Sequence, residues 1–209
     1  MGKIEIRNLL VSECYTNCYL CKNKETGEGF IVDPGENELK ISVNISKMEM
    51  KPVAIILTHG HYDHIGAVNA LKERYGIKVY VSEAEKELIG DKKMNLSSYF
   101  DSPMTIEADE FLKDGQKITL AGINMTFIAT PGHTPGSGCY YLEDNEILFS
   151  GDTLFQTSVG RSDFPGGSAS ALVRSVKEKL LVLPEETHVY PGHMEETTIG
   201  YEKLHNPFI

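Results

Sequence analysis

The sequence predicts a mixed α/β fold in which β-sheets pack together and are covered by helices. Short apolar runs that are typical of buried strands, such as residues 53–57, alternate with segments whose apolar residues recur at helical spacing, such as residues 65–75. Turn residues such as Ala121-Gly122 separate other strand-like runs by only a few positions, which indicates hairpins beside crossover units. Packed sheets covered by helices accommodate both kinds of connection.

The first half of the chain contains several strand-like runs. They lie at residues 3–10, 16–22, 29–32, 53–57 and 78–81. Helices are expected over residues 36–49, over residues 65–75 and from Ser82 onward. In the first of these segments, however, Ile41, Val43 and Ile45 alternate as they would in a strand. Gly76 ends the second helix, and residues 95–110 follow no regular pattern.

The second half is predicted to be richer in strands. They lie at residues 117–120, 123–129, 139–142, 147–150 and 187–190. A helix begins at Ser168, carries Leu172 and Leu180 at helical spacing, and ends before Pro184. A last helix is expected after His193. Polar clusters follow several of these strands, which is where open α/β sheets usually bind ligands.

Length and charge restrict the classes of function. A chain of 209 residues can bury a core as one unit, so we expect a single domain over residues 1–209. Its 30 acidic and 20 basic side chains give a net charge of −10, which disfavours nucleic-acid binding because phosphate backbones require clustered Lys and Arg. No apolar run is long enough for a signal peptide or a membrane span, so we expect a cytoplasmic protein without a membrane partner.

The four cysteines allow two interpretations. Cys18 and Cys21 form a Cys-x-x-Cys motif, which occurs in redox pairs and in zinc sites. They lie in a strand-like run, however, where residues three positions apart point to opposite faces, and no second pair completes a structural zinc site. We therefore predict reduced thiols at all of these positions, including Cys14 and Cys139.

Three imidazoles and one carboxylate lie within six residues, directly after the strand at 53–57. The segment is His59-Gly60-His61-Tyr62-Asp63-His64. Imidazole and carboxylate groups are ligands for divalent metal ions. A tightly turning loop can present His59 and His61 to one point, and Asp63 and His64, at the start of the next helix, to a neighbouring one. One short loop can then serve two metals.

Three further candidate ligands occupy matching contexts. His133, Asp152 and His193 each follow a predicted strand at a turn that contains Gly or Pro, where the backbone can bend sharply. Together with the six-residue cluster they predict a metal site. His188 and His205 lack such a context, and we interpret them as ordinary histidines.

This pattern of residues resembles the metallo-β-lactamase-fold superfamily over nearly the whole chain. Within the superfamily, the chain is most similar to the glyoxalase II (hydroxyacylglutathione hydrolase) branch, in particular its short bacterial members. Besides the ligand motif, the resemblance is carried by Asn17-Cys18-Tyr19, Ile31-Val32-Asp33-Pro34-Gly35, Ser150-Gly151-Asp152-Thr153-Leu154-Phe155 and Gly160-Arg161-Ser162-Asp163.

The resemblance implies a four-layer αββα sandwich with metals between the sheet edges. It implies two divalent metal ions per chain, Zn in the first place, with Fe or Mn as alternatives that the same ligands accept. His59, His61 and His133 would hold one ion; Asp63, His64 and His193 would hold the other. Asp152 would bridge the two.

The implied reaction is hydrolysis of a thioester such as S-2-hydroxyacylglutathione. Two cations about 3.5–4 Å apart can hold a water between them and lower its pKa toward about 7, so that the bridging hydroxide attacks the carbonyl carbon. Asp63 would ligate one metal and orient this hydroxide. Asp33 either accepts a hydrogen bond from a metal-bound His or belongs only to its Asp-Pro-Gly turn.

The partner is expected to be a small-molecule substrate, but its identity is not defined. Glutathione-specific members of the branch carry an extra C-terminal helical domain with basic contacts, and this chain ends at Ile209, so we expect that domain to be absent. Arg161 matches the loop position where those enzymes use Lys, and it either binds a substrate carboxylate or pairs with Asp163. Phe155 and Phe164 either line the pocket or pack inside.

Other functions on the same fold stay open at this stage. The main rival is a persulfide dioxygenase, which uses one iron held by residues matching His59, His133 and Asp152. A lactonase and a metal-binding protein without activity are further alternatives, whereas a β-lactamase would normally be secreted. A flavodiiron-type oxidoreductase would be expected to carry Glu in place of His61, and an RNA-processing nuclease a basic surface. The oligomeric state is undetermined.

Overall fold

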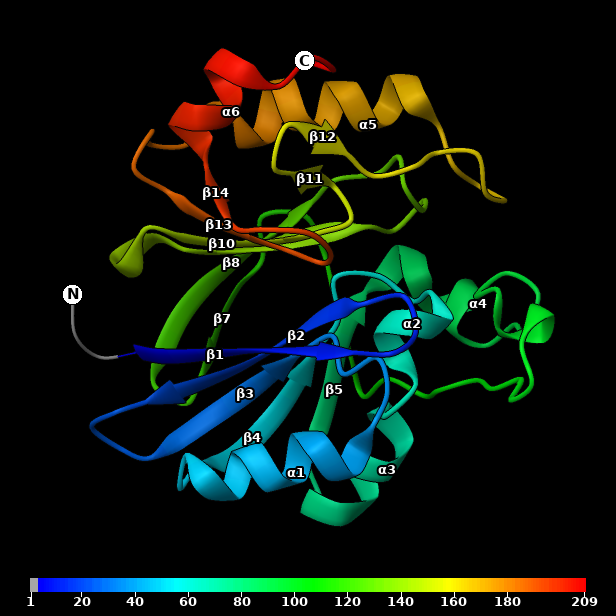
Figure 1. The fold of residues 1–209 in the computed structure, drawn as a ribbon, viewed down its shortest axis with the longest axis vertical. Coiled ribbons are helices and arrows are strands. Elements are labelled where there is room, and N and C mark those ends of the chain that lie inside the picture. The colour runs from blue at the N-terminus through cyan, green and yellow to red at the C-terminus, as the bar shows by residue number, and fades with distance from the viewer. Residues whose placement is uncertain (1–3) are drawn as a thin grey trace.

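The computed structural model describes residues 4–209, which fold into four layers (Figure 1). Two six-stranded sheets pack against each other, and helices cover the outer face of each sheet. The order of the layers is helix, sheet, sheet, helix. This architecture confirms the αββα sandwich that the family resemblance implies.

The first sheet contains the N-terminal strands in their sequence order. They are β1 (Ile4–Val11), β2 (Thr16–Asn23), β3 (Glu28–Val32), β4 (Lys51–Ile56), β5 (Lys78–Ser82) and β6 (Glu110–Leu112). β1, β2 and β3 are antiparallel neighbours, whereas β3 to β6 run parallel to one another. Because parallel strands end at the same edge of a sheet, the loops after β3, β4 and β5 gather there.

The second sheet has the order β14-β13-β10-β9-β8-β7. Its strands are β7 (Lys117–Leu120), β8 (Ile123–Ala129), β9 (Gly138–Leu142), β10 (Ile147–Gly151), β13 (His188–Pro191) and β14 (Thr197–Thr198). β7 to β10 form an antiparallel meander, and β13 lies parallel to β10. A small hairpin of β11 (Leu154–Phe155) and β12 (Ser158–Val159) follows β10.

Helices occupy the two outer layers (Figure 1). α1 (Glu38–Lys47) and α3 (Val68–Tyr75) cover the first sheet; α5 (Ala169–Ser175), a π-helical turn (Val176–Leu180) and α6 (Ile199–His205) cover the second. The connections contain α2 (Tyr62–Ile65), α4 (Lys86–Ile89) and 3-10 turns at Glu83–Glu85, Ser97–Tyr99 and Glu143–Asn145.

Three apolar clusters hold the layers together. Ile41 and Leu71 belong to the cluster that joins α1 and α3 to the first sheet. Phe30 and Phe149 belong to the cluster between the two sheets, and Val176 to the cluster beneath the C-terminal helices. Burial of these side chains stabilises the fold because it removes apolar surface from water.

The predicted strands of both sheets are confirmed, with bounds that differ by one or two residues; Lys3 lies outside the described residues. The helix expected over residues 36–49 is α1. Ile41 and Ile45, one turn apart, are buried, whereas Val43 between them is 51% exposed, so the segment is amphipathic with the period of a helix. The alternation of Ile41, Val43 and Ile45 is therefore incidental.

The single helix predicted over residues 65–75 is wrong in its first part. The chain forms α2 and then α3, with Gly66 and Ala67 between them. Gly66 lies against the backbone carbonyl of Gly35, and the Ala67 N–H donates to the Pro34 carbonyl at 2.9 Å, so contacts with a neighbouring loop interrupt the helix. β6, β11, β12 and β14 are not predicted because two or three residues are too few to show a period.

Cys18 and Cys21 lie on opposite faces of β2, as predicted. Cys18 belongs to the cluster that joins α1 and α3 to the first sheet, and Cys21 belongs to the cluster between the two sheets. All four cysteines are free. Burial raises the pKa of the Cys18 and Cys21 thiols above its ordinary value, which keeps them protonated and unreactive at neutral pH. The Cys-x-x-Cys motif is therefore neither a redox pair nor part of a zinc site.

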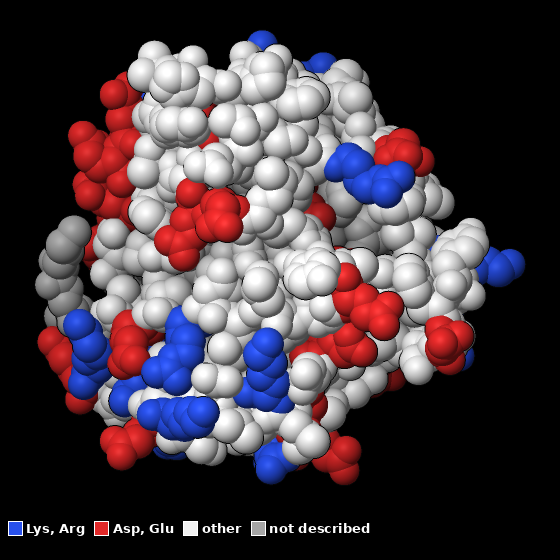
Figure 2. Space-filling view, in the orientation of Figure 1, with Lys and Arg blue, Asp and Glu red and all other residues white. Residues whose placement is uncertain are grey.

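Basic and acidic side chains are interspersed on the face of the molecule shown in Figure 2. Lys and Arg gather over the region of β1, β3 and α1, at the lower left, where Asp and Glu lie among them. Within residues 4–209, no helix has both the length and the apolar character needed to cross a membrane. The absence of a nucleic-acid partner stays a prediction.

Candidate metal centre

All candidate ligands lie in segments that directly follow strands. They are His59, His61, Asp63 and His64 in the loop and short helix after β4, His133 after β8, Asp152 after β10 and His193 after β13. The structure brings all of these side chains to one place between the two sheets, although they span residues 59–193. The fold thus brings together loops that lie far apart in the sequence.

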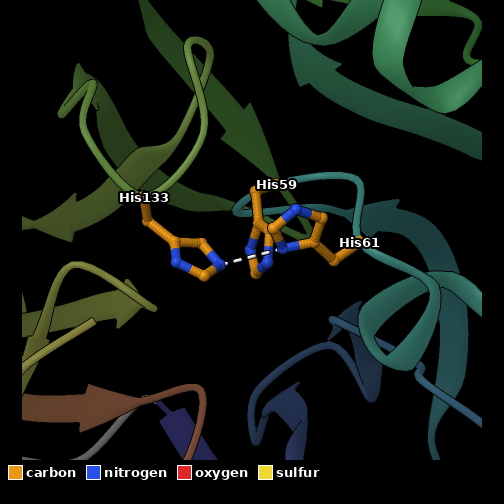
Figure 3. Close-up of side chains that lie close together, drawn as sticks. All are labelled: His59, His61 and His133. Atoms are coloured by element: carbon orange, nitrogen blue, oxygen red, sulfur yellow. Dashed lines mark hydrogen bonds between the residues drawn. The ribbon is translucent and has the colours of Figure 1, made fainter. Parts of the chain in front are cut away.

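The first group of candidate ligands consists of three imidazoles (Figure 3). The rings of His59 and His61 come from the loop after β4 and face the ring of His133, which comes from the second sheet. The His59 and His61 ring centroids are 4.8 Å apart, and His61 Nδ1 lies 2.9 Å from His133 Nε2. All three residues are buried, with no more than 2% of each exposed.

The second group consists of Asp63, His64 and His193. The Nε2 atoms of the two histidines are 3.3 Å apart, and Asp63 Oδ2 lies 3.6 Å from His64 Nε2 and 3.3 Å from His193 Nε2. Three candidate ligand atoms thus converge on a point beside the first group. The His193 side chain is 20% exposed, so this group is more open.

Asp152 lies between the two groups. One carboxylate oxygen, Oδ1, is 3.4 Å from His64 Nε2, and the other, Oδ2, is 3.5 Å from His133 Nε2 and 3.6 Å from His193 Nε2. A single carboxylate therefore reaches both groups. This is the geometry that a bridging ligand requires.

Hydrogen bonds on the outer side of the rings orient four of the five histidines. The acceptors for Nδ1 are carbonyl oxygens for His133 (Arg161 O, 2.6 Å) and His193 (Cys14 O, 3.2 Å), and a carboxylate for His64 (Asp33 Oδ2, 3.1 Å). Because these oxygens only accept, Nδ1 carries a proton and Nε2 is the ring nitrogen that faces the centre. Such partners are typical of metal-binding histidines.

Asp33 acts beyond its turn. Its carboxylate accepts hydrogen bonds from the Thr58 N–H at 2.8 Å and from the Thr58 hydroxyl at 2.6 Å, besides that from His64. Since the Thr58 hydroxyl donates to Asp33, it is free to accept from His59 Nδ1, which lies 3.2 Å away. The sequence left two roles open for Asp33, and the structure shows that it accepts a hydrogen bond from His64, a candidate ligand.

Buried atoms without partners test whether this cluster fits metal ions. Among the described residues, the buried side-chain nitrogen and oxygen atoms that lack a hydrogen-bond partner are His59 Nε2, His61 Nε2, Asp152 Oδ1 and Thr187 Oγ1. Three of these belong to candidate ligands. Because an unpaired buried polar atom is costly, a partner that these groups can share is expected, and divalent cations fit the donor set.

The two groups differ in their proton affinity. Burial and neighbouring imidazoles lower the pKa of His59 far below its ordinary value and that of His61 to about 3. For His64, burial also lowers the pKa, but Asp63, Asp152 and Asp33 outweigh it and raise the pKa to about 10. For Asp63, burial has the opposite effect and raises the pKa, because it disfavours the charged carboxylate. The adjacent imidazoles of His64 and His193 outweigh burial and bring the pKa of Asp63 below its ordinary value.

Glu85 is a residue of the site that the sequence analysis missed. Its carboxylate is completely buried and accepts hydrogen bonds from the Gly60 N–H at 2.7 Å, the Thr134 hydroxyl at 2.7 Å and the Gly136 N–H at 2.9 Å. Gly60 lies between two candidate ligands, and Thr134 follows a third. Glu85 therefore ties the loop after β4 to the loop after β8, whereas the sequence places it among other Glu residues without distinguishing it.

Two glycines allow the close packing of the ligand loops. Gly151 has a left-handed backbone, with φ +50°, and lies against the Thr58 side chain. A side-chain carbon at Gly192 would overlap Asp152 Oδ1 and the His64 ring. The small residues beside Asp152 and His193 are thus required by the geometry of the centre itself.

A cavity of about 670 Å³ opens above the centre. His61, Asp63, His133, Asp152 and His193 form its floor. Aromatic and apolar side chains form much of its wall; they include Tyr62, Leu96, Tyr99, Phe100, Phe155 and Phe164. Phe155 and Phe164 therefore line the pocket, which decides between the two alternatives that the sequence left open.

Arg161 lines this cavity and also pairs locally. Its Nε and Nη2 donate to the two carboxylate oxygens of Asp163, each at 2.8 Å, and its guanidinium lies 3.9 Å from the centroid of the Phe164 ring. The local pair that the sequence allowed is therefore present. Contact between Arg161 and a substrate stays a prediction.

Similarity to known proteins identifies the family of this chain. A family model described as the metallo-beta-lactamase superfamily matches residues 11–193. The chain belongs to the metallo-β-lactamase superfamily. The matched segment includes every candidate ligand of the metal centre, from His59 to His193.

Relatives within the metallo-β-lactamase superfamily match nearly the whole chain. The probable metallo-hydrolase YqgX of Bacillus subtilis (strain 168) is 37% identical over 97% of this chain and 96% of its own length. Hydroxyacylglutathione hydrolase GloC of Haemophilus influenzae is 32% identical over 99% of this chain and 98% of its own.

Solved structures show the same likeness. The BLEG-1 B3 metallo-β-lactamase is 39% identical, with a TM-score of 0.93 over 98% of this chain and 99% of its own. The protein TTHA1623, solved in a di-iron-bound form, is 34% identical, with a TM-score of 0.86 over 97% of this chain and 100% of its own.

Proposed function

We propose that this protein is a hydrolase that holds two divalent metal ions and cleaves thioesters of the glyoxalase II type. The observation that carries the proposal is the position of Asp152, whose oxygens lie 3.4–3.6 Å from imidazole nitrogens of both ligand groups. Similarity to GloC supports the thioester as substrate, and similarity to TTHA1623 in its di-iron-bound form supports two metals.

In this proposal, each group of ligands holds one cation. His59, His61 and His133 bind the first, Asp63, His64 and His193 bind the second, and Asp152 contacts both. Zn is the resident ion that we propose, and Fe or Mn would suit the same donors. When bound, the cations supply a water of lowered pKa as nucleophile and polarise the carbonyl oxygen of the substrate.

Asp63 is the residue of the chain that we expect to orient the attacking water. Its Oδ2 accepts a hydrogen bond from the Thr16 hydroxyl at 3.1 Å, which fixes the carboxylate at the floor of the cavity. The low pKa of Asp63 keeps it ionised, so that it accepts a hydrogen bond from the water. Hydrolysis joins the water oxygen to the acyl carbon, breaks the carbon–sulfur bond and transfers a proton to the thiolate.

The second group is where the proposed hydrolase and its main rival differ in what they require. A persulfide dioxygenase needs one iron, held by residues matching His59, His133 and Asp152. Here His64 and His193 also have acceptors for their Nδ1 protons and direct Nε2 toward Asp63 and Asp152. Because the dioxygenase branch shares the ligand motif, the identity and number of the bound metal ions, rather than these residues, distinguish the two functions.

Hydrolysis of β-lactams is the second candidate function. It is favoured by the likeness to the BLEG-1 B3 metallo-β-lactamase, which extends over nearly the whole chain. The same centre would attack the carbonyl carbon of a lactam, because the nucleophile does not depend on the leaving group. Cleavage of a chromogenic cephalosporin distinguishes this candidate from thioester hydrolysis.

Elemental analysis of the purified protein, combined with enzyme assays, tests the proposal. We expect two metal ions per chain and hydrolysis of S-D-lactoylglutathione or a related thioester without consumption of oxygen. One iron per chain, together with oxygen consumption on glutathione persulfide, would contradict the proposal and establish the dioxygenase.

A further inference from the structure

We infer that the cavity above the metal centre selects uncharged thioesters whose thiol part is apolar, in preference to glutathione thioesters. The inference rests on the proposed function, because it names the substrate class of that same site. Two observations carry it: the aromatic wall of the cavity and the ion pair that neutralises the guanidinium at its mouth.

The aromatic wall begins with a flat platform. The rings of Tyr62 and Phe100 are stacked, with centroids 3.9 Å apart and planes inclined by 24°. Phe100 is 47% exposed and its neighbour Tyr99 is 75% exposed, so large apolar surfaces face solvent at the mouth. Exposed apolar surface at the rim of a cavity favours an apolar ligand, because the ligand removes that surface from water.

The wall continues down to the candidate ligands on both sides. The Phe164 ring lies 5.6 Å from the ring of His61, and the Phe155 ring lies 6.1 Å from the ring of His193, measured between centroids. Each ligand group therefore has an aromatic ring beside it. The group bonded to the reacting carbonyl carbon of a substrate would lie between the Phe155 and Phe164 rings. A charged group there would lose its hydration without gaining a polar partner from either ring.

The charge at the mouth of the cavity is already compensated. Arg161 is the one Lys or Arg among the described residues that line this cavity. Its two-point pair with Asp163 and its contact with the Phe164 ring occupy one edge and one face of the guanidinium.

Glutathione fits such a cavity poorly. At neutral pH its tripeptide carries two carboxylates and one ammonium group, and the positive charge of Arg161 that would attract these carboxylates is already offset by Asp163. An uncharged apolar group meets no such competition and covers the rings of Tyr62, Phe100 and Phe164. A volume of about 670 Å³ accommodates a ligand of that kind.

The test compares three D-lactoyl thioesters that share the acyl group and differ in the thiol: benzyl mercaptan, N-acetylcysteamine and glutathione. After correction for their alkaline hydrolysis rates, we expect kcat/KM of the metal-loaded protein to be at least about tenfold higher for the benzyl than for the glutathione thioester. An equal or higher value for glutathione overturns this inference alone. Hydrolysis of none of the three overturns the proposed thioesterase function itself.

Two variants separate the contributions of the ion pair and the wall. Asp163→Asn releases Arg161, so the ratio of benzyl to glutathione activity should fall severalfold; Asp144→Asn removes the same charge from an exposed turn outside this cavity and should leave the ratio unchanged. Phe100→Ala should lower kcat/KM for the benzyl thioester about tenfold more than for the glutathione thioester. A ratio that Asp163→Asn leaves unchanged overturns the role of the ion pair.

Discussion

The two ligand groups of the metal centre are built from similar residues but in different environments. His59, His61 and His133 form a buried cluster of imidazoles. Asp63 and His193, in the second group, face the cavity, with 12% and 20% of their side chains exposed. The first group therefore contains only imidazole donors with almost no exposed surface, whereas the second contains a carboxylate that faces the cavity.

This difference shows that one short segment of the chain can supply ligands to two unlike groups. The loop after β4 places His59 and His61 in the first, closed group, and α2 then places Asp63 and His64 in the second, open group, where Asp63 faces the cavity and His64 is fully buried. A closed group anchors a metal, and an open group places one beside the substrate. Asp152, between them, is the residue on which both depend.

Loss of Asp152 should have the largest effect, because it removes the shared ligand. In Asp152→Ala we expect both metal sites to weaken together and kcat/KM for thioesters to fall by at least about 10³-fold. Metal content after dialysis measures the first effect. Asp144→Ala, which removes an exposed carboxylate, is the matched control, and retention of two tightly bound metals in Asp152→Ala would refute the bridging role.

Substitutions within one group should reveal the asymmetry directly. We expect His61→Ala to lose the metal of the closed group and His193→Ala to lose the metal of the open group, each with about one ion retained per chain. Both should reduce activity by about 10²-fold or more, since the reaction uses both ions. Elemental analysis after dialysis measures the loss; if either variant lost both ions, the two groups would constitute a single cooperative site.

Glu85 offers a smaller effect confined to the closed group. In Glu85→Gln one carboxylate oxygen becomes an amide nitrogen, so the N–H of either Gly60 or Gly136 loses its acceptor. The loop that carries His59 and His61 is then held less firmly, and we expect metal affinity to fall about tenfold. Competition with a metal chelator measures this affinity. Glu83→Gln, at a neighbouring exposed carboxylate, should behave as wild type, and equal affinities in all three proteins would remove Glu85 from the site.

The pH dependence of the metal-free protein should be the most subtle difference. The pKa of His64 rises from 6.5 to about 10 on folding, so its contribution to stability is present below pH 6.5 and is lost as the pH rises toward 10. The pKa of His61 falls from 6.5 to about 3, so this residue lowers stability as the pH drops below 6.5.

Melting temperatures of chelator-treated proteins measure these opposite signs. The destabilisation caused by His64→Asn should shrink between pH 6.5 and 10, whereas that caused by His61→Asn should shrink as the pH falls from 6.5 toward 4. Differences from wild type that stay constant with pH would contradict the assignment of distinct proton affinities to the two groups.

The sequence signal for the candidate ligands is local. His59, His61, Asp63 and His64 lie in six consecutive positions, and the remaining ligands each follow a strand at a small-residue turn. The long strands and α1 are equally local, since their periods can be counted. The same reasoning fails where a tertiary contact decides, as at Gly66, where the neighbouring loop around Gly35 interrupts a helix.

The surroundings of the ligands could not be predicted because they depend on contacts between distant segments. Glu85 lies among three Glu residues in five positions, and only the fold reveals which of them is buried between two loops. The stacking of Tyr62 on Phe100 joins α2 to an irregular segment without a sequence pattern. For Arg161, both alternatives were chemically sound, and the geometry shows the pair with Asp163.

Anomalous diffraction from crystals of the metal-loaded protein, recorded at the absorption edge of the bound metal, tests the central claim most directly. The account predicts two peaks, one among His59, His61 and His133 and one among Asp63, His64 and His193, with Asp152 between them. A single peak confined to the first group would contradict it.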